Sequence, residues 1–542
     1  MPLTATGDLL AVQRLLPSLA VYPDLGWIFF HYLFPIGASK VPTLTGPSSF
    51  LDRRERGAAM GPHRKGKRSF VLLDPEQRKE LTPRRGQTAH NLGTAHTFTQ
   101  EEHSKGGERG RSMRQGPREA EDHTATDNPQ DGTPPHIALF IPSLGGGGVE
   151  RAMLHLAGAF VERGARVDLL VGRAEGPSLT RVPAQLNLVA LQAASEGWTR
   201  FVIFTADPTG LKTLLRPALL PPNGSGLFRY LSDLTRYLRR QRPQVLLSAM
   251  TKSNLMAVWA RHLAGVPTRL VICEQNTLSP NISEPRKKRK WRRRLLSSLV
   301  GRVYPGADAI IAVSNGVADD LAQCAGIPRE RITTIYNPIV TAGLVTQSRA
   351  LLDHPWLQRG APPVILGVGR LHEQKDFPTL LRAFARVRAK QETRLLILGE
   401  GKSGGLRAEL LALAAQLGIA NDVALPGFVA NPFAYLARAA VFVLSSAWEG
   451  LPSVLIEALA CGCPVVSTDC PSGPAEILEN GKYGPLVPVG DVVALAEAIC
   501  AVLATPPHRD WLRARGALFA VDRIADRYLE MLLDPVSESA AP

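Results

Sequence analysis

The sequence predicts an α/β protein in which two doubly wound parallel sheets face each other across a cleft. From Pro135 onward, short β-branched runs alternate with amphipathic helical stretches, as in parallel βαβ units. The alternation occurs twice, and a proline-containing linker at about 341–361 separates the two series. Of the 542 residues, 45% are hydrophobic. This is ordinary for globular domains and disfavours a fibrous or largely disordered chain.

The first series predicts an N-terminal, Rossmann-like domain over 135–345. Its expected strands are 136–143, 166–172, 244–250, 269–273, 309–314 and 332–336. Its expected helices include 149–163 and 253–264. The segment 205–225 interrupts the alternation and is expected to be a loop or an insertion.

The second series predicts a C-terminal, Rossmann-like domain over 361–508. Its expected strands, 364–369, 394–399, 441–446 and 464–468, are apolar on all sides, as strands covered on both faces should be. The expected helices are 377–390, 405–418, 453–461 and 491–504, and a last helix within 509–535 should pack back toward the first domain. Ligands of such sheets bind beyond the carboxyl ends of the strands, where functional motifs are therefore expected.

Residues 1–130 differ from the rest of the chain. From 52 to 130 there is little apolar periodicity, while charges, glycines and prolines are frequent. Such sequence buries too little apolar surface to offset chain entropy. We expect a largely disordered extension without a fold. A functional arm, an upstream extension and a misassigned start codon remain open as explanations.

Several protein classes are disfavoured. No run of about 18 uncharged apolar residues exists, so no transmembrane helix is expected. The first ten residues lack the basic region of a signal peptide and include Asp8. Six cysteines are too few for a disulfide scaffold, and Cys461-Gly-Cys463 has no second pair to complete a zinc site. A reducing cytoplasm is the expected compartment.

A glycine run at 145–148 joins the first expected strand to a helix. Its glycines let the backbone approach a bulky ligand, and the helix start offers free N–H groups to an anion. The nicotinamide-dinucleotide pattern fails, because Glu150 stands where the third glycine is required. The run favours a phosphate or sugar contact over a merely flexible turn.

Two further motifs follow strands of the second series. Arg370 comes directly after a buried strand and Lys375 precedes a helix, which suits neutralisation of a diphosphate leaving group, although a surface Arg and Lys is an equally open interpretation. The segment 398–403 resembles half of a phosphate-binding loop, but Leu396 stands where the full pattern requires glycine. We expect a tight turn there that borders a nucleotide.

The most specific motif spans 445–466. Glu449 lies in the loop after an expected strand, and Pro452 and Ser453 suit a helix start. Glu457 follows about one turn into this helix and should point toward the same cleft. Because 454–461 is otherwise apolar, a solvated position for Glu457 is disfavoured. Two carboxylates are therefore expected to face one ligand.

Glu449, seven intervening residues, Glu457 and then Ala-Cys-Gly-Cys-Pro-Val-Val resemble the hallmark of the retaining glycosyltransferases of family 4, which have the GT-B fold. The resemblance extends over 135–533 and includes motifs at 145–150, 312–316, 336–338, 369–375 and 426–428. The variant Leu451-Pro452-Ser453, followed by 468–474, is similar to the branch that builds bacterial surface polysaccharides and lipid-linked oligosaccharides.

The resemblance implies that the domain over 135–345 binds the acceptor and the domain over 361–508 binds the nucleotide sugar, and it implies roles for individual residues. Arg370 and Lys375 would bind the donor diphosphate and stabilise the departing nucleotide, Glu449 would hold the donor sugar, and Glu457 the ribose hydroxyls. It implies further donor contacts at Gly146, Gly147, Gly148, Gly399, Glu400, Gly427, Phe428, Val429, Gly450, Leu451, Pro452 and Ser453. No cofactor and no catalytic metal are implied, because Arg, Lys and helix ends neutralise the diphosphate.

One departure concerns the acceptor side. Relatives often place a histidine after a glutamate at the strand end where this chain has Glu274-Gln275-Asn276. Gln275 can hydrogen-bond a sugar but cannot titrate, which puts acid–base catalysis at this position in doubt. Retention is expected to proceed by attack on the same face, without an assigned protein nucleophile.

Most of the chain's formal charge of +15 lies in one stretch. Residues 1–130 contribute +4, whereas 284–302 has nine basic residues against one acidic residue. Trp291, Leu295 and Leu299 recur at helical spacing, which predicts a basic amphipathic helix with contacts at Arg289, Trp291 and Arg293. An anionic membrane surface or a lipid-linked acceptor is favoured over a solvated helix face. Nucleic acid is disfavoured, because no recognition motif accompanies the charge.

Together these features predict a retaining, metal-independent glycosyltransferase. It would transfer a hexose or N-acetylhexosamine from a nucleotide diphosphate sugar, with a UDP-sugar favoured, to a lipid-linked or growing saccharide at the cytoplasmic face of the cell membrane. Two alternatives remain: another nucleotide-sugar enzyme of the same fold, such as an epimerase or a sucrose-type synthase, and a catalytically silent membrane-binding or RNA-binding protein.

Overall fold

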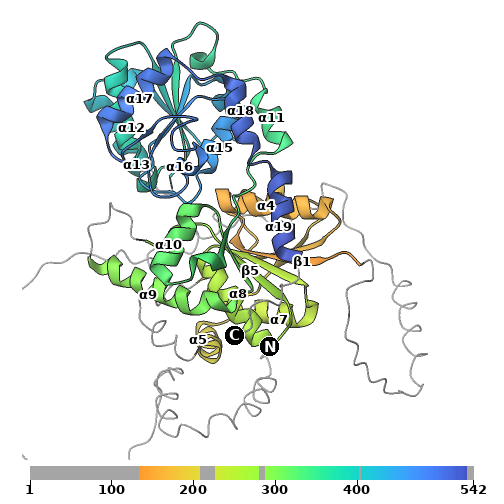
Figure 1. The fold of residues 1–542 in the computed structure, drawn as a ribbon. Coiled ribbons are helices and arrows are strands. Elements are labelled where there is room, and N and C mark those ends of the chain that lie inside the picture. Colours follow the sequence, from red (N-terminus) through yellow and green to blue (C-terminus); the bar gives the residue numbers. More distant parts are fainter. Residues whose placement is uncertain (1–132, 208–225, 280–286, 402–404, 534–542) are drawn as a thin grey trace, which may run out of the picture. The chain divides into compact units, whose positions relative to one another are not determined.

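The computed structural model describes residues 133–207, 226–279, 287–401 and 405–533 (Figure 1). The predicted extension 1–130 lies outside the described residues, as does most of the expected insertion 205–225.

The first sheet has seven parallel strands in the order β3-β2-β1-β4-β5-β6-β7. The strands are β1 (His136–Ser143), β2 (Arg166–Arg173), β3 (Asn187–Ala190), β4 (Val245–Ala249), β5 (Arg269–Glu274), β6 (Ala309–Ala312) and β7 (Ile332–Thr334). β1 pairs with both β2 and β4, so the strand order reverses between β1 and β4. In doubly wound sheets a ligand crevice forms at such a reversal.

Helices connect these strands. They are α4 (Gly148–Glu162), α5 (Glu196–Ala206), α7 (Leu231–Gln241), α8 (Thr251–Ala264), α9 (Lys287–Val303) and α10 (Asn315–Ala325). The ends of α10 follow from local sequence: the Ser314 side chain accepts a hydrogen bond from the Val317 amide, and Gly326 ends the helix in a left-handed conformation. The expected linker at 341–361 contains a further short helix, α11 (Ala342–Ser348).

The second sheet has six parallel strands in the order β10-β9-β8-β11-β12-β13, with its reversal between β8 and β11. The strands are β8 (Val364–Val368), β9 (Arg394–Leu398), β10 (Val423–Gly427), β11 (Val441–Leu444), β12 (Val465–Thr468) and β13 (Leu486–Val487). The helices are α12 (Phe377–Arg388), α13 (Gly405–Gln416), α14 (Pro432–Arg438), α15 (Ser453–Ala460), α16 (Pro474–Ile477) and α17 (Val492–Ala504).

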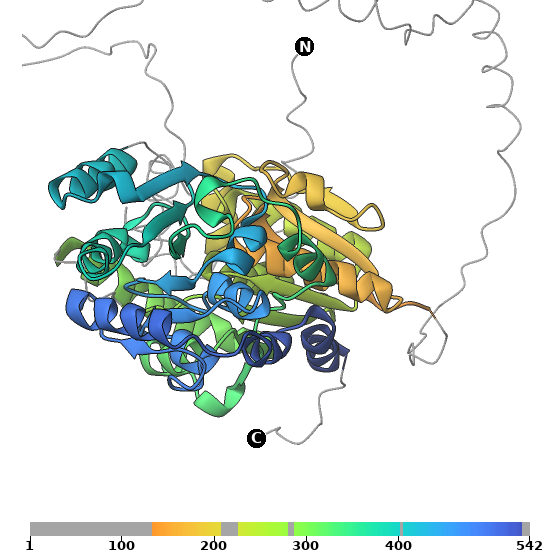
Figure 2. The same cartoon turned by 90° about the horizontal axis from the view of Figure 1, so that it is seen from above.

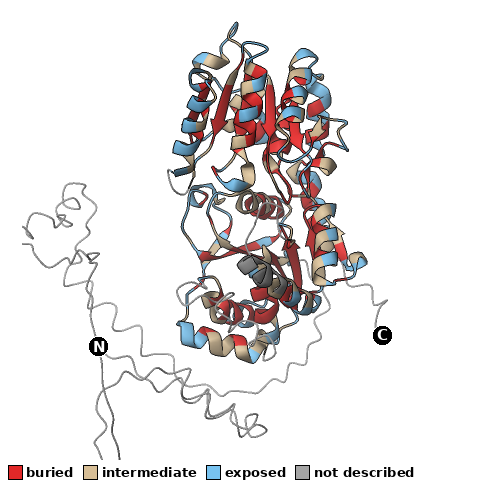
Figure 3. Cartoon of the chain, turned by 90° about the vertical axis from the view of Figure 1, so that its left-hand side faces the viewer, coloured by how far each residue is buried: buried red, intermediate tan, exposed pale blue. Residues whose placement is uncertain are grey.

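Helices cover both faces of the second sheet (Figures 1 and 2). Successive side chains of a strand point to opposite faces. Accordingly, Val441 and Val443 of β11 belong to one hydrophobic core with α12 and α17, whereas Phe442 and Leu444 belong to another core that includes α15. Figure 3 shows the strands buried along their length. The predicted class, two doubly wound parallel sheets, is confirmed.

The chain ends with two helices, α18 (Arg509–Ala517) and α19 (Val521–Leu533), where a single helical stretch was expected. The break places Phe519, which is 1% exposed, where its carbonyl accepts hydrogen bonds from the amides of Ile339 and Val340. α19 then lies against the first domain, where the Tyr528 hydroxyl is 3.4 Å from the Cys273 Sγ. None of the helices in the described part of the chain has the length and apolarity needed to span a bilayer.

Candidate functional site

An ion pair joins the two segments that leave β8 and β11, on either side of the strand-order reversal. Lys375 Nζ lies 2.6 Å from Glu449 Oε1, and the Ser446 hydroxyl donates to the same oxygen at 2.7 Å. The Gln374 amide also donates to the Trp448 carbonyl at 2.9 Å. The structure therefore brings two predicted site residues together where a doubly wound sheet binds its ligand.

Arg370, which follows β8, differs from Lys375. Its side chain is exposed and forms no hydrogen bond or ion pair with another described residue. The same loop thus carries a guanidinium that is available for binding and an ammonium group held by a carboxylate. Both can bind an anion such as a diphosphate, Arg370 directly and Lys375 by sharing its protons between Glu449 and the ligand.

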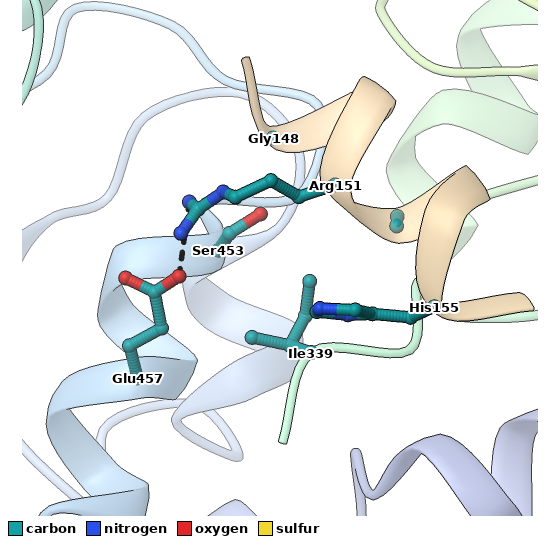
Figure 4. A pocket seen from close by; sticks show the side chains of 7 residues that line it. Gly148, Arg151, His155, Ile339, Ser453 and Glu457 are labelled. Atoms are coloured by element: carbon teal, nitrogen blue, oxygen red, sulfur yellow. Dashed lines mark ion pairs between the residues drawn. The ribbon is translucent and has the colours of Figure 1, made fainter. Parts of the chain in front are cut away.

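Glu457 lies in α15 and faces α4 of the first domain (Figure 4). Its Oε1 is 3.0 Å from Arg151 Nη2, and Glu457 is 4% exposed. The two side chains border a small cavity that is partly open to solvent. The lining residues are Gly148, Arg151, Ala152, His155, Ile339, Ser453 and Glu457.

The glycine run approaches α15 closely. A Cβ added at Gly148 would lie 3.0 Å from the Ser453 Oγ, so a side chain at position 148 would crowd the start of α15. Gly147 occupies the N-cap position of α4, and Gly146 has a φ of 77°, which favours glycine. The run therefore places backbone, rather than side chains, opposite Ser453 and Glu457.

Arg151 and His155 were not among the residues predicted from the sequence. They are four residues apart in the first turns of α4, so they share one helix face behind the glycine run. His155 Nδ1 is 3.0 Å from the Pro338 carbonyl, which can only accept a hydrogen bond. Burial lowers the pKa of His155, while the bond to Pro338 opposes this shift. The i, i+4 spacing after the glycines was a usable indication, but their partner on another domain was not visible in the sequence.

Two of the predicted donor-binding segments meet at the ends of β9 and β10. The Gly399 amide donates to the Gly427 carbonyl at 2.8 Å. Gly399 has a φ of 136°, and a Cβ there would lie 1.9 Å from the Gly369 carbonyl oxygen, so this turn requires glycine. Phe428 is 71% exposed. An exposed ring beside this turn is available to stack on a planar base.

Glu274 and Gln275, predicted for the acceptor side, have internal partners. Glu274 is fully buried and accepts hydrogen bonds from the Tyr304 hydroxyl at 2.6 Å and the Thr251 hydroxyl at 3.0 Å. Burial raises the pKa of Glu274, and these hydrogen bonds oppose that shift. Gln275 is also buried and accepts from the Asn337 amide at 2.8 Å. Neither lines the cavity at Glu457, whereas Asn276 is exposed.

A second contact between the domains involves the loop that begins at Gly450. The Ser314 and Ser472 hydroxyls donate to the Gly450 carbonyl at 3.0 and 2.8 Å. A Cβ at Gly450 would lie 2.1 Å from the Gln275 carbonyl oxygen. The neighbouring Leu451 and Pro452 are buried. This loop therefore docks its backbone directly on the end of β5.

Comparison with known proteins identifies the family. A model described as glycosyltransferase family 4 matches residues 146–342, and a model described as glycosyl transferases group 1 matches residues 362–505. An N-acetylgalactosaminyltransferase of Campylobacter jejuni is 34% identical over 288 residues, which are 52% of this chain and 74% of that protein. The chain belongs to the family 4 glycosyltransferases. The resemblance and the prediction of a glycosyltransferase are confirmed.

Other relatives agree with this assignment. A lipopolysaccharide core biosynthesis glycosyltransferase of Rhizobium meliloti is 28% identical over 399 residues, covering 71% of this chain and 96% of that protein. The fold is similar to that of Anabaena HepE in complex with UDP and glucose, with a TM-score of 0.57 and 20% identity over 73% of this chain and 98% of the other. It is also similar to a lipopolysaccharide outer core galactosyltransferase, with a TM-score of 0.53 and 21% identity over the same shares. These neighbours show the GT-B fold.

The basic stretch of this glycosyltransferase forms α9, but the side chains of Arg289, Trp291 and Arg293 lie outside the described residues. In the last turn of α9, Arg302 pairs with Asp207 at 2.8 Å. Among the described residues, no group of three or more His, Cys, Asp and Glu side chains is arranged to hold a metal ion.

Proposed function

We propose that this glycosyltransferase transfers a hexose or N-acetylhexosamine from a UDP-sugar to a lipid-linked or growing saccharide, with retention of configuration and without a metal ion. The observation that carries the proposal is the Lys375–Glu449 ion pair across the strand-order reversal, with the exposed Arg370 beside it. The placement supplies two cations for a diphosphate and one carboxylate for the hydroxyls of the transferred sugar.

The chemistry follows from these charges. As the bond between the sugar and the diphosphate breaks, negative charge develops on the departing phosphate oxygen. Arg370 and Lys375 stabilise that charge where a metal ion would otherwise be needed. Glu449 accepts hydrogen bonds from the sugar and orients it. The acceptor hydroxyl attacks on the face that the diphosphate leaves, and the departing phosphate oxygen takes its proton.

The acceptor side is inferred from relatives and from charge. The Campylobacter jejuni relative is named for an acceptor on diphospho-undecaprenol, and the Rhizobium meliloti relative is named for lipopolysaccharide core biosynthesis. Lys287 to Arg294 include seven basic residues. We propose that this part of α9 binds the anionic surface of the cytoplasmic membrane, or the diphosphate of a lipid carrier, and so brings the acceptor to the cleft.

The identity of the donor is tested by measuring the thermal stability of the protein with each member of a panel of nucleotide sugars. A donor that binds the native state raises its thermal stability by mass action. The stabilising donor is then incubated with lipid-linked saccharides, and the anomeric configuration of the product is determined by NMR, with and without EDTA. We expect a UDP-sugar to stabilise the protein and a retained anomer to form in EDTA. Inversion of the anomer, or loss of turnover in EDTA, contradicts the mechanism, and a changed nucleotide sugar without any acceptor indicates an epimerase.

A further inference from the structure

The contact between Arg151 and Glu457 joins the two domains at the carboxylate that the family resemblance assigns to the donor ribose. Arg151 lies in the first turns of α4 and Glu457 in α15. Their side chains are 27% and 5% exposed, and Figure 4 shows both pointing into the same cavity. The cavity is far smaller than sites that enclose a ligand, so it marks where the two domains meet at Glu457 and does not itself enclose a nucleotide sugar.

The hydrogen-bonding groups at this contact are only partly used. Arg151 Nη2 contacts Oε1 of Glu457, whereas Oε2 accepts no hydrogen bond from any described residue. Arg151 Nε is buried and has no partner within the described part of the chain. A carboxylate can accept about four hydrogen bonds. Glu457 therefore keeps acceptor positions for two hydroxyls while Arg151 remains bound.

The charge at this contact comes from Arg151. Leaving an ionised carboxylate nearly buried without a cation is costly. His155, one turn further along α4, does not supply the charge, because burial favours its neutral form and Nδ1 is held by the Pro338 carbonyl. Among the residues that line this cavity, Arg151 thus neutralises the negative charge of Glu457. It belongs to the opposite domain.

We infer that Arg151 is a positioning residue that holds Glu457 ready to accept the ribose hydroxyls of the donor. The ribose subsite is then complete only when the first domain lies against α15. This inference rests on the proposed use of a nucleotide diphosphate sugar. Without the Arg151 ion pair, Glu457 would be less well placed for its charged hydrogen bonds to the ribose hydroxyls, so ribose recognition should weaken by about tenfold to a hundredfold.

Calorimetry with the full chain tests the inference, using UDP, 2′-deoxy-UDP and 3′-deoxy-UDP as probes. The variants are Arg151→Gln, Arg151→Lys and a matched control, Arg163→Gln. Arg163 lies immediately after α4 and pairs at the surface with Asp526 at 2.7 Å. We expect the preference for UDP over its deoxy analogues to fall by about tenfold or more in Arg151→Gln, to recover partly in Arg151→Lys, and to stay at the wild-type value in Arg163→Gln.

A second measurement separates positioning from general destabilisation. In a Glu457→Gln background, Arg151→Gln should cause no further loss of UDP affinity, because the two residues act through one contact. Equal weakening of UDP and deoxy-UDP by Arg151→Gln, an unchanged preference, or additive losses in the double variant each overturn the inference. If the wild-type protein binds no nucleotide diphosphate or nucleotide sugar, the proposed function itself fails.

Discussion

Each of the two sheets carries a buried glutamate where the chain leaves a strand near the reversal, and the two differ in their partners. Glu274 ends β5 and is surrounded by neutral donors, the hydroxyls of Tyr304 and Thr251 and its own turn amides. Glu449 follows β11 and is paired with Lys375. Glu274 is 0% exposed, whereas Glu449 is 8% exposed.

This difference separates a carboxylate with a structural role from one whose hydrogen-bonding partner can be shared with a ligand. The neutral donors around Glu274 are held in place by the fold and stay bonded to it. Glu274 therefore stabilises the turn after β5. An ammonium group on a flexible side chain can share its hydrogen bonds with an incoming phosphate, so the Lys375–Glu449 pair can rearrange around a donor. Burial alone therefore does not distinguish Glu449, the carboxylate proposed to bind the donor sugar, from Glu274. The charge of the partner does.

The largest effect is expected for Lys375→Gln, which removes the cation from the site carboxylate. Loss of one preorganised charge at a developing oxyanion lowers kcat by about a hundredfold to a thousandfold. Lys390→Gln is the matched control, since Lys390 is exposed and lies beyond the end of α12. Steady-state kinetics with the identified donor measures the effect. Retention of more than about half of the wild-type kcat would show that Lys375 has no role in charge stabilisation.

The next effect concerns Gly450, where the Glu449 loop contacts the turn that follows Glu274. A Cβ at position 450 would lie 2.1 Å from the Gln275 carbonyl, and both groups are backbone, so the clash is relieved only by moving the two domains apart. We expect Gly450→Ala to lower kcat/KM by up to about a hundredfold, since small misplacements of reacting groups have effects of this size. Gly405→Ala, at a position with nothing within 4 Å, is the control. Equal kinetics of the two variants would contradict the contact.

Tyr304→Phe tests the structural side of the comparison. It deletes the hydroxyl that donates to Glu274 at 2.6 Å and accepts from the Asn254 amide at 3.1 Å. Leaving both buried groups without this partner should reduce the free energy of unfolding by about 2 kcal/mol. Below the unfolding transition kcat should stay at the wild-type value. Urea unfolding and steady-state kinetics on the same preparation separate the effect on stability from the effect on kcat. A fall in kcat without loss of stability would assign Glu274 to catalysis.

The fold was predictable where strands are long, central and apolar, and the strands that were missed are short or lie at edges. β10 contains Pro426 and Gly427, which argue against a strand. β10 is the edge strand of its sheet, and its pairing with β9 is irregular between Ala424 and Gly427, where the proline stands. β13 has only two residues, and β3 is a four-residue edge strand. Patterns of this length carry too little periodicity to be recognised.

The site was predictable to the extent that it is local in sequence. The spacing of Glu449 and Glu457, and of Arg370 and Lys375, places each pair on one loop or helix start. Arg151 and the contact between Gly450 and Gln275 depend on how two separately folded domains dock, which no spacing within one segment encodes. The same limit explains Glu274: its position at a strand end was visible, but the Tyr304 hydroxyl that engages it comes from a helix 30 residues later.

The smallest effect concerns Asp168, another buried carboxylate, which lies on β2 and sharpens the contrast with Glu274. Burial alone would raise its pKa, but hydrogen bonds from His136, Tyr237 and Asn187 lower the pKa from 3.8 to about 2. Because the folded-state pKa lies below the unfolded value, Asp168 stabilises the protein above pH 4 and this stabilisation is lost as the pH falls toward 2.

Between pH 7 and pH 3 the wild-type protein should lose about 1 kcal/mol of unfolding free energy through Asp168. Asp168→Asn should be less stable at pH 7 and should lack this part of the acid-dependent decline. Glu274 should behave in the opposite sense. Because burial raises its pKa, its contribution to the free energy of unfolding weakens as the pH rises above 4.5, the ordinary pKa of a glutamate. Urea unfolding of the wild type and of Asp168→Asn at a series of pH values measures how the free energy of unfolding depends on pH. Parallel curves for wild type and Asp168→Asn between pH 7 and pH 3 would mean that these neutral and imidazole donors do not hold Asp168 ionised.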